Sequence, residues 1–180
     1  MIRLIGIKKS FRDKPVLRNA SLEVREGESV VIIGRSGSGK SVTLRHILGL
    51  IEPDAGHVFV DGQDVSRLDR RKRFRLLEKM GMLFQNSALW DSMTVFENVA
   101  LALRQTSNMP ENQVRDRVYE CLNMVGLGDL NAVDETGVVW MGQRYPAELS
   151  GGMRKRVGLA RAIAPKPKYM LYDEPTTGLD

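Results

Sequence analysis

The chain has 180 residues, with 27 lysines and arginines against 22 aspartates and glutamates, a formal net charge of +5 and one cysteine. This length suits one domain, or one domain with an inserted lobe, and a single cysteine excludes a disulfide scaffold and a cysteine-cluster zinc site. The longest strongly apolar run, residues 30–33, is too short to cross a membrane, and no apolar stretch typical of a signal peptide follows Met1.

The first thirty-odd residues predict short strands joined by turns. Residues 2–8 and 16–24 alternate apolar and polar side chains, which is typical of strands with one buried face. The β-branched run at residues 29–33 is bounded by glycines and predicts a strand buried on both faces. Next come, in order, a helix that ends near Gly49, a strand at residues 57–60 and a tight turn at Asp61-Gly62.

Helices predominate in the second half of the chain. Residues 94–97 form a capping box, and an apolar stripe at helical spacing follows it. Pro110 fits the first turn of the next helix, and Gly126 fits its end. The other predicted elements are a basic helix at 69–79, a strand at 80–84, a glycine-led helix at 150–164 and an apolar strand at 169–172.

Residues 34–41, with the sequence GRSGSGKS, match the pattern G-x-x-x-x-G-K-[ST] between a predicted strand and a predicted helix. Glycines in such a loop let several backbone N–H groups converge on a phosphate, and the following helix adds the positive end of its dipole. Lys40 supplies a positive charge for the β- and γ-phosphates, and the Ser41 hydroxyl can ligate Mg²⁺. The predicted nucleotide contacts are Gly34, Ser36, Gly37, Ser38, Gly39, Lys40, Ser41 and Val42.

The apolar strand at residues 169–172 ends in the acidic pair Asp173-Glu174. A site for a Mg-nucleotide needs a carboxylate at the end of a buried strand, and Asp173 fits that position as a ligand of Mg²⁺. Glu174 is placed to accept a proton from the attacking water, and a positioned base contributes roughly 10²–10⁴ in rate. Strands often end in acidic turns, so the pair predicts nucleotide hydrolysis only together with the phosphate loop.

The segment Leu149-Ser150-Gly151-Gly152-Met153 resembles the signature motif of ATP-binding-cassette (ABC) ATPases, and it lies just upstream of the acidic strand, as in that family. A helix N-terminus with exposed N–H groups suits a phosphate contact. The resemblance implies that Ser150, Gly151 and Gly152 contact ATP held by the other subunit of a head-to-tail homodimer. It also implies that Gln85 senses both Mg²⁺ and the attacking water, as a metal ligand and a catalytic residue.

Two more segments match the family. Residues 177–180 match the loop that crosses the dimer interface, and Phe11 lies where the family places an aromatic side chain that stacks on adenine. An aromatic residue after a strand is also common in a core, so both roles stay open for Phe11.

The resemblance implies an α/β fold of the P-loop NTPase class. It has a RecA-like core with an N-terminal antiparallel β-subdomain and an inserted α-helical subdomain. The expected organisation is a single ABC ATPase domain over residues 1–180. The nucleotide-binding core is expected at 1–88 and 156–180, and the helical subdomain with the signature motif at 89–155.

Met153 departs from the glutamine that is commoner at the fifth signature position. With residues 82–90 and 93–99, it resembles the lipid-transport branch that includes the Mla-type, or toluene-tolerance, phospholipid transporters. This implies an ATPase subunit that moves phospholipid or another lipid between inner and outer membranes and lies in the cytoplasm, peripheral on the cytoplasmic face of the inner membrane. The implied partners are integral membrane permease subunits and a periplasmic lipid-binding component, with no nucleic acid.

Two other functions remain open. One is an ABC importer ATPase for a small solute such as an amino acid. The other is a soluble ABC ATPase that acts outside transport, on DNA, ribosomes or iron–sulfur clusters. The chain has no room for the coiled-coil insertion of DNA-repair members, and it has one cassette where ribosome-acting members have two.

The family also predicts further core strands and a histidine at the γ-phosphate after the acidic strand, whereas His46 and His57 both precede it. The chain is therefore expected to be a cassette truncated at its C-terminus, poorly stable and at best weakly active alone.

Two exposed-looking features have alternative interpretations. The resemblance places the groove for the permease's coupling helix at residues 85–99, where Phe96 fits the core and Trp90 fits either an interface or the core. The basic run at residues 70–75 fits a solvated helix face, or a contact with anionic lipid.

Overall fold

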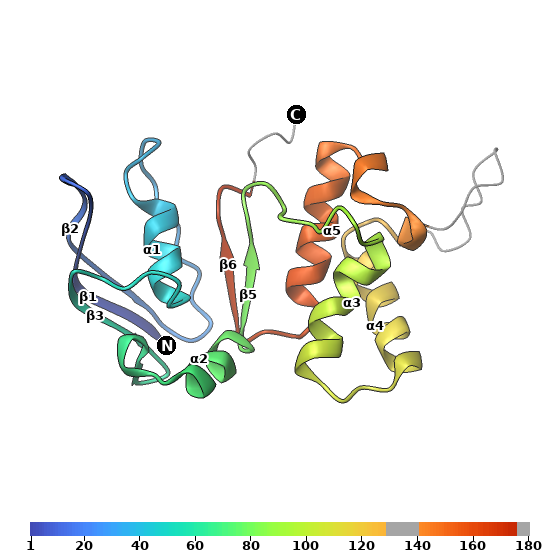
Figure 1. The fold of residues 1–180 in the computed structure, drawn as a ribbon, viewed down its shortest axis with the longest axis horizontal. Helices are drawn as coiled ribbons and strands as arrows, with labels where there is room; N and C mark the ends of the chain where they lie inside the picture. Colours follow the sequence, from blue (N-terminus) through green and yellow to red (C-terminus); the bar gives the residue numbers. More distant parts are fainter. Residues whose placement is uncertain (129–140, 176–180) are drawn as a thin grey trace. The chain divides into compact units, whose positions relative to one another are not determined.

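The computed structural model describes residues 1–128 and 141–175, and the chain forms two compact units, residues 1–77 and residues 78–180 (Figure 1). The first unit contains a four-stranded antiparallel sheet in the order β2-β1-β3-β4. This confirms the strands predicted at residues 2–8, 16–24 and 57–60. The strands are β1 (Ile2–Phe11), β2 (Lys14–Val24), β3 (Ala55–Val60) and β4 (Gln63–Asp64).

The turn between β3 and β4 is the one predicted at Asp61-Gly62. Both residues have positive φ angles, 49° and 78°, as a two-residue hairpin turn of this twist requires. Strand β1 bends beside Gly6, whose φ is 58°, where its pairing register with β2 shifts. A Cβ added at Gly56 would lie 2.5 Å from the Gly6 carbonyl oxygen, so β3 can approach β1 this closely only with glycine there.

Helix α1 (Lys40–Ile47) contacts β3, and the apolar residues of the two elements form the core of the first unit together with β1. Ile47 and Leu48 are buried, as are Val58 and Val60 of β3. A short 3-10 helix, Val65–Arg67, and helix α2 (Arg70–Leu77) complete the unit. The basic helix predicted at residues 69–79 is therefore confirmed.

The strand predicted at residues 29–33 is wrong. Residues 28–35 have no regular secondary structure, and Val31 and Ile33 are 80% and 91% exposed. The described strands of the first unit pair only with one another, and none of them pairs with this β-branched run. Apolar, β-branched composition favours a strand but does not supply the neighbouring strand that a buried one requires.

The second unit contains a parallel strand pair and three helices. Strand β5 pairs with β6 in the register Met80 to Tyr169 through Leu83 to Tyr172, which confirms both predicted strands. A Cβ at Gly81 would lie 2.5 Å from the Ala162 carbonyl oxygen, so the helix that precedes β6 packs directly on the backbone of β5. The elements are β5 (Met80–Leu83), α3 (Val95–Thr106), α4 (Glu111–Met124), α5 (Gly151–Ile163) and β6 (Tyr169–Tyr172).

Helices α3, α4 and α5 pack against one another around a single apolar cluster (Figure 1). The predicted capping box is present, since the Thr94 hydroxyl accepts from the Glu97 N–H and the Glu97 carboxylate accepts from the Thr94 N–H. Pro110 lies at the N-cap of α4, one residue before the predicted first turn, and Gly126 with φ 70° follows its end. Buried members of the cluster include Val95, Val99, Leu103, Val114, Val118, Leu122 and Val157.

Asn98 is fully buried on α3 and fixes the loop that precedes the helix. Its Nδ2 donates to the carbonyl oxygens of Trp90, Met93 and Thr94 at 3.0–3.1 Å, and its Oδ1 accepts from the Trp90 N–H at 2.8 Å. One buried side chain thus forms hydrogen bonds with four backbone groups of this loop.

Asn98→Ala is expected to lower the free energy of unfolding by about 1–3 kcal/mol, because it removes the hydrogen bonds of a fully buried side chain, among them those to the Trp90 N–H and the Met93 carbonyl oxygen. Urea unfolding measures the change. The exposed Asn112 on α4 is the matched control, and Asn112→Ala is expected to change stability little. Equal effects of the two substitutions would contradict the role given to Asn98.

Candidate functional site

The phosphate loop, residues 34–41, leads directly into α1 and is built on glycine. Gly39 is the N-cap residue of α1, with φ 100° and ψ 6°, and a Cβ there would lie 2.7 Å from Cδ2 of Leu17. A Cβ at Gly34 would lie 2.6 Å from Oγ of Ser38. The positive φ and the close contact exclude a larger residue at Gly39 in this conformation, whereas at Gly34 the Ser38 hydroxyl would have to rotate away.

Lys40 closes this loop with its own side chain. Its Nζ donates to the carbonyl oxygens of Gly34 and Arg35, at 3.0 and 3.3 Å. The first turn of α1 contains no acidic residue, so no carboxylate of that turn offsets the positive end of the helix. A glycine cradle with this charge fits the phosphates of a nucleotide.

The predicted acidic pair, Asp173 and Glu174, follows the C-terminal end of β6. The Asp173 N–H donates to the Leu83 carbonyl oxygen at 2.9 Å and so extends the parallel pairing by one residue, and Asp173 is 8% exposed. Glu174 leaves the strand with φ 47°, in the left-handed region. The pairing therefore fixes Asp173, while the chain turns sharply at Glu174.

Gln85 and Glu174 meet at this edge. Gln85 follows β5 and Glu174 follows β6, and the carboxyl ends of parallel strands lie at the same edge of a sheet. Nε2 of Gln85 donates to Oε2 of Glu174 at 3.0 Å. With Nε2 used in this way, Oε1 of Gln85 is the atom suited to a metal. Carboxylate and amide oxygens are among the ligand types that Mg²⁺ prefers, so Asp173 and Gln85 suit that ion.

The signature segment forms the N-terminus of α5. Ser150 is the N-cap residue, and its Oγ accepts from the Met153 N–H at 3.2 Å. A Cβ at Gly151 would meet no atom within 4 Å, so open space surrounds this helix end. Ser150, Gly151 and Gly152 thus present the first N–H groups of a 13-residue helix to the outside of their unit. The loop predicted at residues 177–180 lies outside the described residues.

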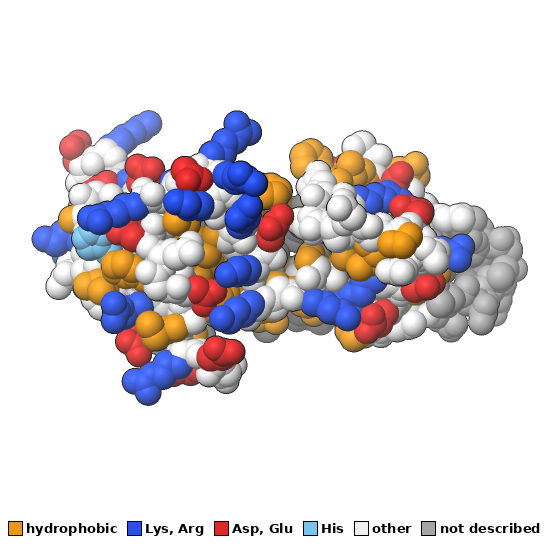
Figure 2. Space-filling view, turned by 90° about the horizontal axis from the view of Figure 1, so that it is seen from below, with side chains coloured by type: hydrophobic (Ala, Val, Ile, Leu, Met, Phe, Trp, Pro, Cys, Tyr) orange, Lys and Arg blue, Asp and Glu red, His pale blue; other side chains and the backbone are white. Residues whose placement is uncertain are grey.

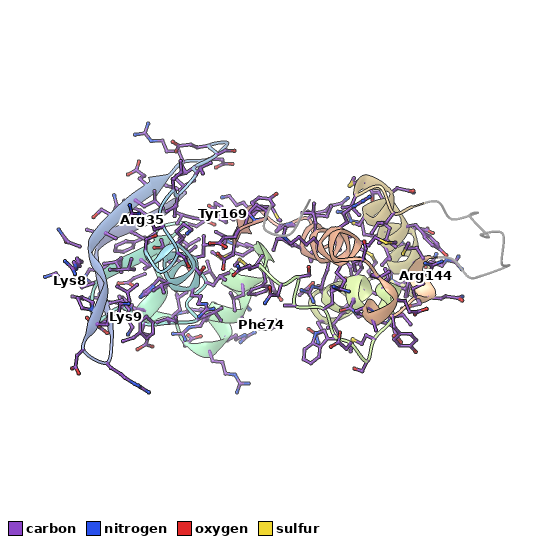
Figure 3. The ribbon with its side chains drawn as sticks, turned by 90° about the horizontal axis from the view of Figure 1, so that it is seen from above. Lys8, Lys9, Arg35, Phe74, Arg144 and Tyr169 are labelled. Atoms are coloured by element: carbon purple, nitrogen blue, oxygen red, sulfur yellow. The ribbon has the colours of Figure 1, made fainter. Side chains whose placement is uncertain are left out.

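Phe11 lies at the end of β1 and is 44% exposed, so the alternative that placed it in the core is wrong. The ammonium nitrogen of Lys9, labelled in Figure 3, lies 5.8 Å from the centroid of its ring. Its role in stacking on adenine stays a prediction.

Three other sequence features also have a place in the structure. Phe96 packs against the apolar cluster of the second unit, as predicted, whereas Trp90 is 57% exposed, so its assignment to the core is wrong. Cys121 is buried, and burial raises the pKa of its thiol, so it packs as an unreactive core residue.

The basic run on α2 is exposed except at Arg73, which is half-buried. Figure 2 shows Lys and Arg side chains over the face of the first unit that carries this helix. Lys72 pairs with Asp69 at 3.6 Å and Arg73 with Glu52 at 3.8 Å, while the ring of Phe74 is 54% exposed. These contacts fit the solvated-face interpretation.

Sequence reasoning missed Arg161 on α5. Its guanidinium donates to the carbonyl oxygens of Ser87 and Ala88, just after Gln85. The available signal was an arginine four residues after Val157, on the apolar side of its helix.

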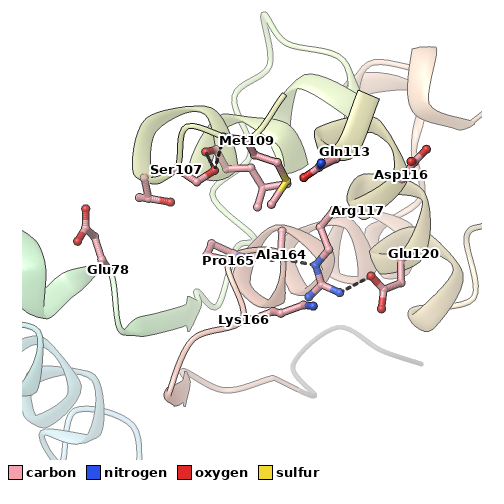
Figure 4. A pocket seen from close by; sticks show the side chains of 12 residues that line it. Glu78, Ser107, Met109, Gln113, Asp116, Arg117, Glu120, Ala164, Pro165 and Lys166 are labelled. Atoms are coloured by element: carbon pink, nitrogen blue, oxygen red, sulfur yellow. Dashed lines mark hydrogen bonds and ion pairs between the residues drawn. The ribbon is translucent and has the colours of Figure 1, made fainter. Parts of the chain in front are cut away.

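An open cavity of about 460 Å³ lies in the second unit where α4 meets the end of α5 (Figure 4). Arg117 crosses it, donating to the carbonyl oxygens of Ile163 and Ala164 and pairing with Glu120 at 2.7 Å. None of the residues predicted to bind nucleotide lines this cavity. Its arginine satisfies the last carbonyl groups of α5 and is a structural feature of the helix end.

The glycine-rich loop that leads into α1, the acidic strand end and the signature helix define the chain as a P-loop NTPase of the ATP-binding-cassette class. The chain belongs to the ABC transporter family, whose model matches residues 17–177. Within the described residues, no helix is long and apolar enough to cross a membrane.

Named relatives include two groups of transport ATPases. The methionine import ATP-binding protein MetN of Carboxydothermus hydrogenoformans is 48% identical over 162 residues, which are 90% of this chain and 44% of that protein. The probable ribonucleotide transport ATP-binding protein mkl of Mycobacterium leprae is 39% identical over 179 residues, 99% of this chain and 48% of that protein. The chain thus spans about half the length of the curated relatives it matches.

A solved structure supports the fold. The ATP-binding cassette MJ0796, determined as a dimer in a post-hydrolysis state bound to ADP and Pi, is similar with a TM-score of 0.87 and 35% identity, over 100% of this chain and 76% of that chain. The predicted fold class is therefore confirmed.

Proposed function

We propose that this chain is the ATP-binding and ATP-hydrolysing part of an ABC transporter subunit, and that hydrolysis of Mg-ATP drives transport. The observation that carries the proposal is the 3.0 Å hydrogen bond between Gln85 and Glu174, beside the paired and nearly buried Asp173. It places an amide that can orient water next to a carboxylate that can take its proton. Release of phosphate from Mg-ATP by the purified full-length protein tests the proposal directly.

The phosphate loop provides binding in this proposal. Its backbone N–H groups and those of α1 hold the β- and γ-phosphates, and Lys40 exchanges its contacts with Gly34 and Arg35 for the phosphate oxygens. Phe11 stacks on the adenine. The full set of contacts is the one given above for residues 34–42.

The acidic strand end provides the chemistry. Ser41, Asp173 and Gln85 would hold Mg²⁺, and the bound ion would neutralise charge on the phosphates. Glu174 accepts the proton of the attacking water. Its hydrogen bond to Gln85 keeps the carboxylate aimed at one place, because the side chain otherwise follows a sharp left-handed turn.

The partners follow from the exposed helix end at Ser150-Gly151-Gly152. We propose a head-to-tail homodimer in which this end contacts ATP bound to the other subunit, as a helix N-terminus suits an anion. The dimeric state of the similar cassette MJ0796 supports this. The dimer would lie on the cytoplasmic face of the inner membrane, attached to permease subunits, with no nucleic acid.

For the cargo we propose phospholipid or another lipid, received with a periplasmic lipid-binding component. The support is Met153 and the sequence pattern of residues 82–99, which resemble the lipid-transport branch. A small-solute importer is the second candidate, because a relative 48% identical is named a methionine import protein.

Reconstitution of the complex with its permease separates the two. Stimulation of ATP hydrolysis by phospholipid, and not by amino acids delivered with a binding protein, is expected. Stimulation only by an amino acid would favour the importer.

Trp90→Ala is expected to leave basal ATP hydrolysis nearly unchanged and to weaken assembly with the permease, since the ring is 57% exposed and large aromatic side chains dominate many interfaces. Co-purification from detergent-solubilised membranes measures assembly. Tyr145, which is 47% exposed in the same unit, is the matched control for loss of an exposed aromatic ring. Unchanged recovery of the permease with Trp90→Ala would remove Trp90 from the interface.

A further inference from the structure

The turn that follows Gln85 has an unusual backbone. Ser87 and Ala88 are consecutive residues with φ angles of 59° and 48°, in the left-handed region that side chains other than glycine, asparagine and aspartate rarely occupy. Ser87 is nonetheless buried, with 3% exposure. A strained turn of this kind persists only where its surroundings hold it in place.

Arg161 of α5 holds this turn. Its Nη1 donates to the Ala88 carbonyl oxygen at 2.6 Å and its Nη2 to the Ser87 carbonyl oxygen at 2.7 Å. Within the part of the chain that the structure describes, the guanidinium has no ion pair with a carboxylate. A partly buried charge that depends on two carbonyl groups is costly to release, because no other group then compensates for its lost hydration.

Gly158 brings the same helix close to the same turn. It lies three residues before Arg161, and a Cβ there would lie 3.2 Å from both Cβ of Ser87 and Cδ1 of Leu83. These distances are tighter than ordinary van der Waals contact. Helix α5 therefore contacts the turn at two places. Its backbone packs against the turn at Gly158, and one helical turn later the Arg161 guanidinium donates two hydrogen bonds to it.

We propose that Arg161 is a positioning residue that fastens the Gln85 turn to the signature helix. Helix α5 begins at Ser150-Gly151-Gly152, and the turn at Ser87-Ala88 follows Gln85 by two residues. A displacement of the signature end of this rigid helix therefore moves Gln85 with it, and so changes its hydrogen bond to Glu174. Arg161 makes the position of the catalytic pair depend on the signature helix. The inference rests on the proposed ATP hydrolysis.

The test compares Arg161→Gln, Arg161→Lys and the control Arg156→Gln in the full-length protein. Arg156 lies on the same helix and donates to the Gly126 carbonyl oxygen, in a loop without a predicted catalytic residue. Arg161→Gln is expected to lower kcat per nucleotide site about 10- to 100-fold, as loss of charged hydrogen bonds does, with KM unchanged. Arg161→Lys recovers part of kcat, because an ammonium can reach one carbonyl group but cannot fork to two.

Amide hydrogen exchange gives a readout that a merely structural role would not move. In Arg161→Gln the amides of residues 85–90 are expected to exchange faster, while the rest of α5 and the control protein keep their native rates. Gly158→Ala provides a second variant. Alanine favours a helix over glycine, so this variant is expected to keep its melting temperature while losing kcat, since the added methyl pushes Ser87 away.

The outcomes separate this inference from the function on which it rests. Absence of ATP hydrolysis in the unmodified full-length protein would overturn the proposed function, and exchange at residues 85–90 would then still decide whether Arg161 holds the turn. Native kcat in both Arg161→Gln and Gly158→Ala, with an active parent protein, would overturn the inference alone. So would a uniform rise in exchange along the second unit, which would make Arg161 a general stabiliser.

Discussion

Replacing Glu174 by glutamine in the full-length protein is expected to leave ATP bound but uncleaved. The amide oxygen of the new side chain can still accept from Nε2 of Gln85, so the local geometry is retained, but an amide cannot take a proton from water. Turnover is expected to fall by at least about 10²-fold, the lower end of what a positioned base contributes. Because ATP then persists, the dimer should stay closed, which size-exclusion chromatography with bound radiolabelled ATP detects.

Glu120→Gln is the matched control for this substitution. Glu120 pairs with Arg117 at the end of α5 and is not among the predicted site residues, so loss of its charge should leave phosphate release unchanged. Hydrolysis at the native rate by Glu174→Gln would remove Glu174 as the base. The water would then need another acceptor.

Replacing Lys40 by alanine is expected to abolish ATP binding. The ammonium is the charge offered to the β- and γ-phosphates, and it also braces the loop through the carbonyl oxygens of Gly34 and Arg35. Both contributions disappear together, so affinity should fall by about 10²-fold or more, as loss of a charge-assisted contact in a preorganised site does. Isothermal titration with a non-hydrolysable ATP analogue measures the loss.

Lys72→Ala serves as the control for loss of one lysine. Its side chain is 66% exposed and its ion pair with Asp69 is 3.6 Å long, so binding should be unchanged. Native affinity in Lys40→Ala would contradict the assignment of the phosphate loop, whatever the effect on turnover.

Local sequence signals predicted most elements because they depend on neighbours along the chain. The capping box at residues 94–97 and the turn at Asp61-Gly62 need only their own residues, and both are present. The N-cap role of Ser150 follows in the same way from the glycine-led helix behind it. Motif spacing likewise placed Gln85 and Glu174 at the ends of two strands.

Features that depend on contacts between segments far apart along the chain could not be predicted from the sequence. The strand predicted at residues 29–33 failed because composition does not reveal whether a neighbouring strand is there. The hydrogen bond between Gln85 and Glu174 depends on the register of β5 and β6, which no local pattern specifies. Arg161 donates to the backbone carbonyl oxygens of residues 87 and 88. Every residue type carries such a group, so the identities of these two residues do not predict the contact.

The exposed run at residues 30–33 has a practical consequence. Val30, Val31, Ile32 and Ile33 form an uncharged, β-branched stretch outside any strand, and all four are at least 38% exposed. Such a stretch is a template for edge-to-edge association between copies of a chain. Expression at high concentration therefore carries a risk of aggregation that begins next to the nucleotide loop. Charged substitutions at residues 30–33 would reduce this risk, but they would also alter the segment that leads into the phosphate loop at Gly34.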